Sequence, residues 1–318
     1  MNYLDIYKDN RFQYNKIKLK YIIKYSVIGI SFILMLLSLN LFKAFCQVEN
    51  KIFDIGAVGD LGCGDNGQKT ISSIQNTKTN LTIFLGDLAY TSDLKRFFNQ
   101  SNNLENNNTE SQVLAAIGNH DIGSGDGNKV TRKELMDHYK IPLTGYYSKT
   151  FDNGKILVIG MNFTGLEQKD NVAKNILEND QYAFVKKTLE NSNATFKIIA
   201  SHAPFISQDC SSFIISSCHD SLEKWASAIF SKYHELFKNT GVKLVLSGHN
   251  HNYQRAEKDG ITYIISGLGG QSKYKISHPG NQMFADVYGF LNLSFNNKSI
   301  EGKFIDNNGN MHKDMFTI

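Results

Sequence analysis

Short apolar runs alternate with polar, helix-like stretches along the chain after residue 50. Apolar runs of about four to eight residues bounded by turn residues are typical of buried strands, and apolar residues three or four apart are typical of helices. Strand-like runs lie at residues 53–59, 81–85, 113–117, 156–160, 196–200, 244–246, 263–265 and 290–295, and helical patterns at 69–75, 93–98, 131–139, 176–189 and 222–237. The alternation predicts an α/β domain in which helices pack on sheets.

Turn residues refine this prediction. Asn153-Gly154 and Asp259-Gly260 are hairpin signals, so we expect mixed rather than purely parallel sheets. The Asn-rich tract at 99–111 is predicted to be a surface excursion. No internal repeat or long linker divides residues 47–318, which predicts a single domain.

Residues 1–46 differ from the rest of the chain in charge. They hold seven Lys or Arg against two Asp, a net charge of +5, so residues 47–318 carry −1 of the total of +4. The basic character therefore belongs to the leader, and we expect no nucleic-acid partner for the folded body. Eighteen uncharged residues at 25–42 follow most of the basic ones. This order predicts a membrane segment with a cytoplasmic N-terminus.

The sequence allows two fates for the leader. It is either an uncleaved signal anchor, which the long basic segment favours, or a signal peptide cut near Cys46; a buried core helix is the remaining alternative. Either processed form places residues 47–318 outside the cytoplasm, membrane-anchored or secreted. Cys210 and Cys218 flank a Ser-rich loop and are predicted to form a disulfide in such an oxidising compartment, which leaves Cys63 single.

Five of the apolar runs end in Asp, Asn or His. An Asp after Gly is by itself more often a turn residue than a ligand, and a lone His is usually an ordinary polar side chain. The carboxyl ends of strands in an α/β sheet meet at one edge, however, so these residues can converge. Together they predict a metal site whose oxygen and imidazole donors suit iron, zinc or manganese. The residues are Asp60, Asp87, Asn119 with His120, His202, and His249 with His251.

The same segments resemble a known set of motifs. Residues 59–62, 86–90, 118–121, 199–202 and 248–251 are similar, in order, to the five motifs of the purple (tartrate-resistant) acid phosphatases, within the calcineurin-like metallophosphoesterase superfamily. The glycine-rich run at 265–270 also resembles the family. One mild departure is Ile199, where the family usually has Val.

Two positions place the resemblance within the superfamily. Most metallophosphoesterases carry a ligand His in the first motif, where this chain has Gly62, and purple acid phosphatases use a tyrosine from the second motif, where Tyr90 stands. The resemblance implies Fe3+ beside a divalent metal, Fe2+, Zn2+ or Mn2+. The implied ferric ligands are Asp60, Asp87, Tyr90 and His251, and the implied divalent ligands are Asn119, His202, His249 and the shared Asp87.

The resemblance also implies a reaction and a fold. The reaction is hydrolysis of small phosphate monoesters by a metal-activated hydroxide, with His120 protonating the leaving oxygen. Asp121 either hydrogen-bonds the imidazole of His120 or caps the next turn, and His219 is a candidate second histidine at the rim. Alternatives are a phosphodiesterase or nucleotidase on the same centre, and a catalytically silent surface protein that keeps the metals.

The implied fold is a four-layer αββα sandwich with two mixed β-sheets. The N-terminal transmembrane or signal helix would be added to this domain, and it would make the membrane a partner of the chain.

Overall fold

The computed structural model describes residues 52–318 except 92–93, 107–111, 123–128, 165–176, 209–220, 275 and 277–278, together with isolated positions between residues 16 and 35. The chain divides into two units, Met1–Lys51 and Ile52–Ile318. Within the described part of the chain, no helix is both long enough and apolar enough to cross a bilayer. Most of the predicted span at 25–42, Cys46 and the predicted domain boundary lie outside the described residues, so these stay predictions.

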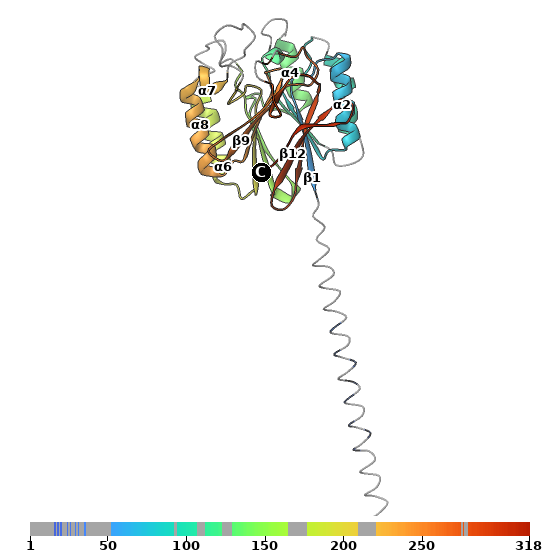
Figure 1. Cartoon of the computed structure of the whole chain (residues 1–318). Coiled ribbons are helices and arrows are strands. Elements are labelled where there is room, and N and C mark those ends of the chain that lie inside the picture. The colour runs from blue at the N-terminus through green and yellow to red at the C-terminus, as the bar shows by residue number, and fades with distance from the viewer. Residues whose placement is uncertain are drawn as a thin grey trace, which may run out of the picture. The chain divides into compact units, whose positions relative to one another are not determined.

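The unit Ile52–Ile318 contains two mixed sheets (Figure 1). In the first sheet the strand order is β13-β12-β11-β1-β2-β3. β1 to β3 are parallel to one another, and β11 to β13 pair in antiparallel fashion. The strands are β1 (Phe53–Val58), β2 (Leu81–Leu85), β3 (Gln112–Ala116), β11 (Gly289–Phe295), β12 (Ile300–Asp306) and β13 (Met311–Thr317).

The second sheet has the order β10-β8-β9-β7-β6-β5-β4. Its central strands β5, β6, β7 and β9 are parallel. Both predicted hairpins are confirmed, because β4 pairs antiparallel with β5 and β8 with β9. The strands are β4 (Tyr147–Phe151), β5 (Ile156–Gly160), β6 (Phe196–Ala200), β7 (Leu244–Ser247), β8 (Tyr253–Lys258), β9 (Ile261–Ser266) and β10 (Met283–Phe284).

Helices cover the outer face of each sheet. One buried cluster joins α2, α3 and α4 to the first sheet, and another joins α6, α7 and α8 to the second. Figure 1 shows α2 on one side of the sheets and α6, α7 and α8 on the other. The helices are α2 (Asp65–Thr77), α3 (Leu94–Asn106), α4 (Lys129–His138), α6 (Tyr182–Glu190), α7 (Leu222–Trp225) and α8 (Ser227–Thr240).

A third buried cluster fills the space between the sheets. Ile83 of β2, Ile198 of β6 and Leu291 of β11 belong to it, whereas the next residues along two of these strands, Phe84 and Ile199, face the helices. Both faces of the central strands are therefore buried, which explains why they read as continuous apolar runs. The three clusters separate four layers in the order helix, sheet, sheet, helix.

The prediction of a surface excursion at 99–111 is wrong for residues 99–106. Helix α3 continues through Asn106, and residues 107–111 lie outside the described part of the chain. Leu94, Phe97, Ser101 and Leu104 are buried and lie three or four residues apart, on one helical face. The abundant Asn residues hid this sparse apolar stripe.

Candidate metal centre

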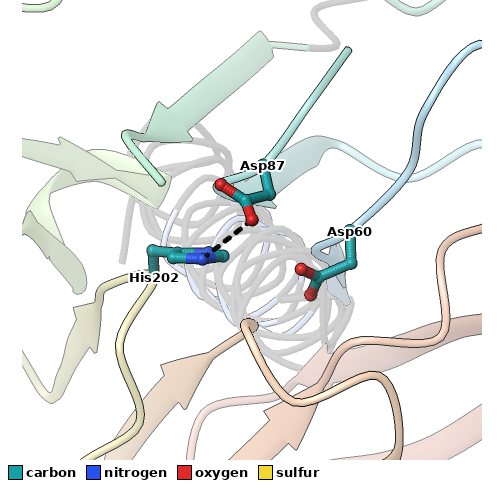
Figure 2. Close-up of side chains that lie close together, drawn as sticks. All are labelled: Asp60, Asp87 and His202. Atoms are coloured by element: carbon teal, nitrogen blue, oxygen red, sulfur yellow. Dashed lines mark ion pairs between the residues drawn. The ribbon is translucent and has the colours of Figure 1, made fainter. Parts of the chain in front are cut away.

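The predicted site residues meet at the carboxyl ends of strands from both sheets. Asp60 follows β1, Asp87 and Tyr90 follow β2, and Asn119 and His120 follow β3 of the first sheet; His202 follows β6, and His249 and His251 follow β7 of the second. The two sheets therefore contribute jointly to one site. Figure 2 shows Asp60, Asp87 and His202 directed toward one another. Their ligand atoms all lie within 4.8 Å of one another.

One group of side chains gathers around the hydroxyl oxygen of Tyr90. The Tyr90 hydroxyl lies 3.0 Å from Asp60 Oδ1 and 3.1 Å from Asp87 Oδ2, and it donates toward these carboxylates. His251 Nε2 lies 3.0 Å from the same hydroxyl oxygen and 3.5 Å from Asp60 Oδ1. These are the four residues predicted to hold ferric iron, and the structure brings them together.

A second group gathers beside the first. Asn119 Oδ1 lies 3.0 Å from His202 Nε2 and 3.0 Å from His249 Nδ1. Those two ring nitrogens are 3.1 Å apart. His202 Nε2 is also 3.3 Å from Asp87 Oδ2, the oxygen that Tyr90 approaches in the first group. Asp87 thus stands between the two groups, where the shared ligand was predicted.

Backbone carbonyls fix the tautomers of two of the histidines. His202 Nδ1 lies 2.8 Å from the Leu85 oxygen, and His251 Nδ1 lies 2.7 Å from the Ser272 oxygen. A carbonyl only accepts, so each Nδ1 carries the proton and each Nε2 is turned toward the carboxylates as a potential ligand atom. Metal-binding histidines are commonly oriented in this way.

Three buried carboxylates give the site its electrostatic character. Asp60, Asp87 and Asp121 are 0%, 2% and 2% exposed, and none of the ion pairs in the described part of the chain joins them to Lys or Arg. Burial by itself would raise the pKa of Asp87, but the imidazoles of His202 and His120 outweigh burial and lower it below its usual value. Burial opposes protonation of His202, yet the charge of Asp87 raises the pKa of His202 to about 10.

These charges make the donor set fit metal ions. Burial, and then the charges of Asp60 and Asp87, raise the pKa of Tyr90 far above its usual value, so without a cation its proton stays on and hydrogen-bonds the carboxylates. A metal ion would take the place of the Tyr90 hydroxyl proton and of the proton on His202 Nε2. Carboxylate, phenol, amide and imidazole donors at this spacing suit hard and borderline cations.

Four of the seven predicted ligands have left-handed backbone conformations. The φ angles are 60° at Asp60, 51° at Asp87, 52° at Tyr90 and 70° at His249. A non-glycine residue in this region costs on the order of 1 kcal/mol. Strained residues that cluster at one place are typical of functional sites, because the surrounding fold must hold them there.

Two glycines shape the site by lacking a side chain. A Cβ at Gly118 would collide with the carboxylate and the amide of Asp87. At Gly62, the position at which the resemblance implied the loss of a ligand histidine, φ is +66° and the side-chain amide of Gln271 fills the adjacent space. A histidine at this position would require both a strained backbone and displacement of Gln271. The structure therefore closes the position and places Tyr90 in the first group instead.

His120 and Asp121 differ in position and contacts. The imidazole of His120 is exposed and packs against the Tyr90 ring, with ring centroids 4.6 Å apart. The buried Asp121 carboxylate accepts hydrogen bonds from the amides of Gly118 (2.8 Å), Asp87 (2.8 Å) and Leu88 (3.0 Å). These contacts join the loops after β2 and β3, and they are neither a hydrogen bond to the His120 imidazole nor a cap of the following turn.

Burial, followed by the charge of Asp87, raises the pKa of Asp121 to about 7.

Several other predicted residues fall elsewhere. His219, Cys210 and Cys218 lie outside the described residues. Cys63 is half-buried and packs against the cluster between the first sheet and its helices. The motifs did not point to Tyr274, whose ring stacks on His251 with centroids 4.2 Å apart and an interplanar angle of 15°. It is an isolated aromatic beyond the glycine-rich run, so only its spacing from those glycines could have drawn attention to it.

The chain belongs to the calcineurin-like phosphoesterase family, whose model matches residues 53–253. None of the curated proteins compared with the sequence matches it.

Among solved structures, the chain is similar to purple acid phosphatase PPD1 from yellow lupin (Lupinus luteus) seeds, with 17% identity and a TM-score of 0.62 over 84% of this chain and 54% of the lupin chain. It is also similar to GAP50, the anchor in the inner membrane complex of Plasmodium, with 17% identity and a TM-score of 0.61 over 84% and 88% of the two chains. PhoD follows at 11% identity and a TM-score of 0.56, over 84% and 68%. At these identities the likeness is one of fold, and this chain spans about half of the lupin chain.

Proposed function

We propose that this protein is a phosphomonoesterase of the acid phosphatase type with a binuclear metal centre. Its family accounts for phosphoester hydrolysis. The observation that carries the finer proposal is the pair of ligand groups that share Asp87, with the hydroxyl of Tyr90 at the middle of one group and Gly62 closed. That combination is the one that the purple acid phosphatase motifs predict.

The two groups would hold different metals. Asp60, Asp87, Tyr90 and His251 would hold ferric iron, because a phenolate and two carboxylates are hard anionic donors. Asn119, His202 and His249, with Asp87 shared, would hold Fe2+, Zn2+ or Mn2+. When bound, two such metals orient the phosphate, lower the pKa of water and offset the charge of the transferred phosphoryl group.

The chain itself supplies the proton for the leaving group. The backbone amide of His120 donates to Asp87 Oδ1 at 2.8 Å, which holds this residue against the centre while its ring stays exposed. A ring nitrogen of His120 can therefore pass a proton to the leaving oxygen of a substrate that reaches the site from solvent. His120→Ala should slow hydrolysis of esters with poor leaving groups much more than that of p-nitrophenyl phosphate; an equal loss would remove His120 from this role.

Two measurements on the purified full chain test the proposal. The first compares hydrolysis of p-nitrophenyl phosphate with that of bis(p-nitrophenyl) phosphate; a large preference for the diester would favour a phosphodiesterase. If the metal-loaded protein hydrolyses neither ester, the result would favour a catalytically silent surface protein. The second is a visible spectrum with metal analysis. A Tyr90-dependent visible band with iron supports the ferric site, and a colourless, zinc-only protein contradicts it.

We also propose a location. The basic leader and the uncharged stretch at 25–42 support an extracytoplasmic domain, either anchored in the membrane or secreted after cleavage near Cys46. A Cys210–Cys218 disulfide and His219 as a rim residue belong to the same proposal. Protease accessibility of the body in intact cells tests the location, and resistance to protease there, with cleavage only after lysis, would contradict it.

A further inference from the structure

Residues 271–274, which we call the strap, lie against two residues of the first ligand group. The amide of Gln271 donates to the backbone oxygen of Asp60 at 3.1 Å. The amide of Tyr274 donates to the backbone oxygen of His251 at 3.0 Å, and the oxygen of Ser272 accepts from His251 Nδ1 at 2.7 Å. The strap thus binds the main chain of both ligand residues and one ring nitrogen of the second.

The ring of Tyr274 adds a contact of another kind. It lies nearly parallel to the imidazole of His251, with an interplanar angle of 15° and centroids 4.2 Å apart. The Tyr90 ring meets the same imidazole at 79°, with centroids 6.1 Å apart. Rotation of the imidazole out of its plane would break the stacked contact, and a 180° flip within that plane would break the bond to Ser272. The stacking therefore fixes the plane of the ring, and the bond to Ser272 selects the orientation within that plane in which Nε2 faces the Tyr90 hydroxyl.

The strap lies where this chain departs from most metallophosphoesterases. The side-chain amide of Gln271 fills the space beside Gly62, the position of the absent ligand histidine. His251 is then the one imidazole among the four residues predicted for the ferric site. The orientation of this one imidazole therefore decides whether the first group offers a nitrogen ligand.

We propose that Tyr274 is a positioning residue of the metal centre, which holds the His251 ring by stacking so that Nε2 faces the Tyr90 oxygen and Asp60. The inference rests on the proposed function in one respect, that a metal binds the first ligand group. Partners that orient a metal-binding histidine are commonly worth about 10- to 100-fold in metal affinity or activity. The aromatic face makes the contact, so the hydroxyl of Tyr274 is not required.

The test compares three variants of the full chain with the wild type: Tyr274→Ala, Tyr274→Phe and Tyr288→Ala. Tyr288 is a matched control, because it is also half-buried and contacts the strap through Lys273, whose Nζ lies 4.6 Å from its ring centroid. The measurements are iron affinity by chelator competition, the visible band, and urea unfolding of the metal-free protein.

We expect Tyr274→Ala to bind iron about 10- to 100-fold more weakly and to shift the visible band. Tyr274→Phe and Tyr288→Ala should keep the wild-type values. Unchanged affinity and band in Tyr274→Ala would overturn the proposal, and so would a defect in Tyr274→Phe as large as that in Tyr274→Ala. Repeating the series with cobalt(II) separates this inference from the iron assignment, since a failure of the ferric proposal leaves the cobalt comparison intact.

Discussion

Two buried groups of charged side chains join the two sheets, and they differ in how their charge is balanced. The first is the metal centre. The second, which we call the clasp, consists of Tyr253 and Arg255 of β8 and Asp314 of β13. Arg255 Nε and Nη2 each lie 2.9 Å from an oxygen of Asp314, and the Tyr253 hydroxyl donates to Asp314 Oδ2 at 2.7 Å. Asp314 is 2% exposed.

The clasp contains its own cation, whereas the metal centre contains none with a permanent charge. A bidentate Arg–carboxylate pair satisfies the buried Asp314 within the chain. Asp60, Asp87 and Asp121 have hydrogen bonds and imidazole neighbours, but no Lys or Arg ion pair in the described part of the chain. In the metal-free centre the carboxylates are balanced by protons on His202 and His251, whose pKa values are raised, and metal ions can replace such protons. One cluster is thus complete within the chain, whereas the other is suited to cations from outside.

The largest expected effect follows from removing one charge at the metal centre while keeping its shape. Asp87→Asn retains the size and much of the hydrogen bonding of Asp87 but weakens the shared ligand, so we expect hydrolysis to fall by more than about 1000-fold. The metal-free protein should also lose stability at neutral pH, because His202 lowers the pKa of Asp87 and the ionised carboxylate therefore stabilises the fold. Initial rates and urea unfolding in chelator test this. Hydrolysis near the wild-type rate in Asp87→Asn would remove Asp87 from the shared ligand position.

The matching change in the clasp should lower the stability of the protein and leave metal binding unchanged. Arg255→Met leaves Asp314 buried without a cation, and loss of one partner of a buried ion pair typically costs about 3–5 kcal/mol. Urea unfolding should show this loss, while metal bound per folded molecule stays at the wild-type value. The triple variant Tyr253→Phe/Arg255→Met/Asp314→Leu should recover most of the stability, since apolar side chains can replace a buried ion pair and no buried hydroxyl is left without its acceptor. No recovery would contradict the assignment of the loss to an unpaired charge.

Metal removal should again distinguish the two clusters, through a smaller change in the free energy of unfolding. A ligand that binds only the folded state stabilises it by about 2.7 kcal/mol at a free concentration of 100 times its dissociation constant. We expect chelation to lower the melting temperature of the wild type and of Arg255→Met alike, and to have little effect on Asp87→Asn. Thermal unfolding with and without chelator measures this. An equal chelator effect in Asp87→Asn would place the stabilising metal elsewhere.

The smallest effect concerns alkaline pH. Burial, and then the charge of Asp314, raise the pKa of Tyr253 well above its usual value of 10.0. Above pH 10 the unfolded chain loses this proton and the folded chain keeps it, so its contribution is full below pH 10 and falls as the pH rises. The slope approaches about 1.4 kcal/mol per pH unit. Tyr253→Phe lacks this contribution.

Urea unfolding between pH 9 and pH 11 measures the contribution of Tyr253, as the difference in free energy of unfolding between wild type and Tyr253→Phe. Desolvation also raises the pKa values of Tyr147, Tyr233 and Tyr263, and these residues affect both proteins equally. The stability gap should therefore narrow as the pH rises. A constant gap would mean that Tyr253 ionises in the folded protein as readily as in the unfolded one.

The metal centre was more predictable from sequence than the clasp. Each predicted ligand lies a few residues past the end of a strand, and the carboxyl ends of parallel strands meet at one edge, so local pattern and motif order named residues that the structure brings together. Arg255 and Asp314 are 59 positions apart and meet because the two sheets pack together. No local pattern encodes that packing. The same reason hides Tyr274, which reaches His251 across a loop.

The strands show the same division. All eight predicted strands are present, because runs that are buried on both faces are continuously apolar. β12 and β13 were not predicted. In β12, buried Ile300 and Phe304 alternate with Glu301 and Lys303, so it has no continuous apolar run. Its place became evident only from its pairing with β11.

The path of β1 has a practical consequence for how the protein is held. Its first residue, Phe53, pairs with Phe295 and packs near Phe151, at the edge of the sheets away from the ligands, and Asp60 stands just past its last residue. A six-residue strand separates these edges by about 20 Å. A fusion partner, an affinity tag or a solid support joined directly to Ile52 is therefore attached at the edge away from the ligands, so immobilisation at that residue leaves the opposite edge accessible to dissolved esters.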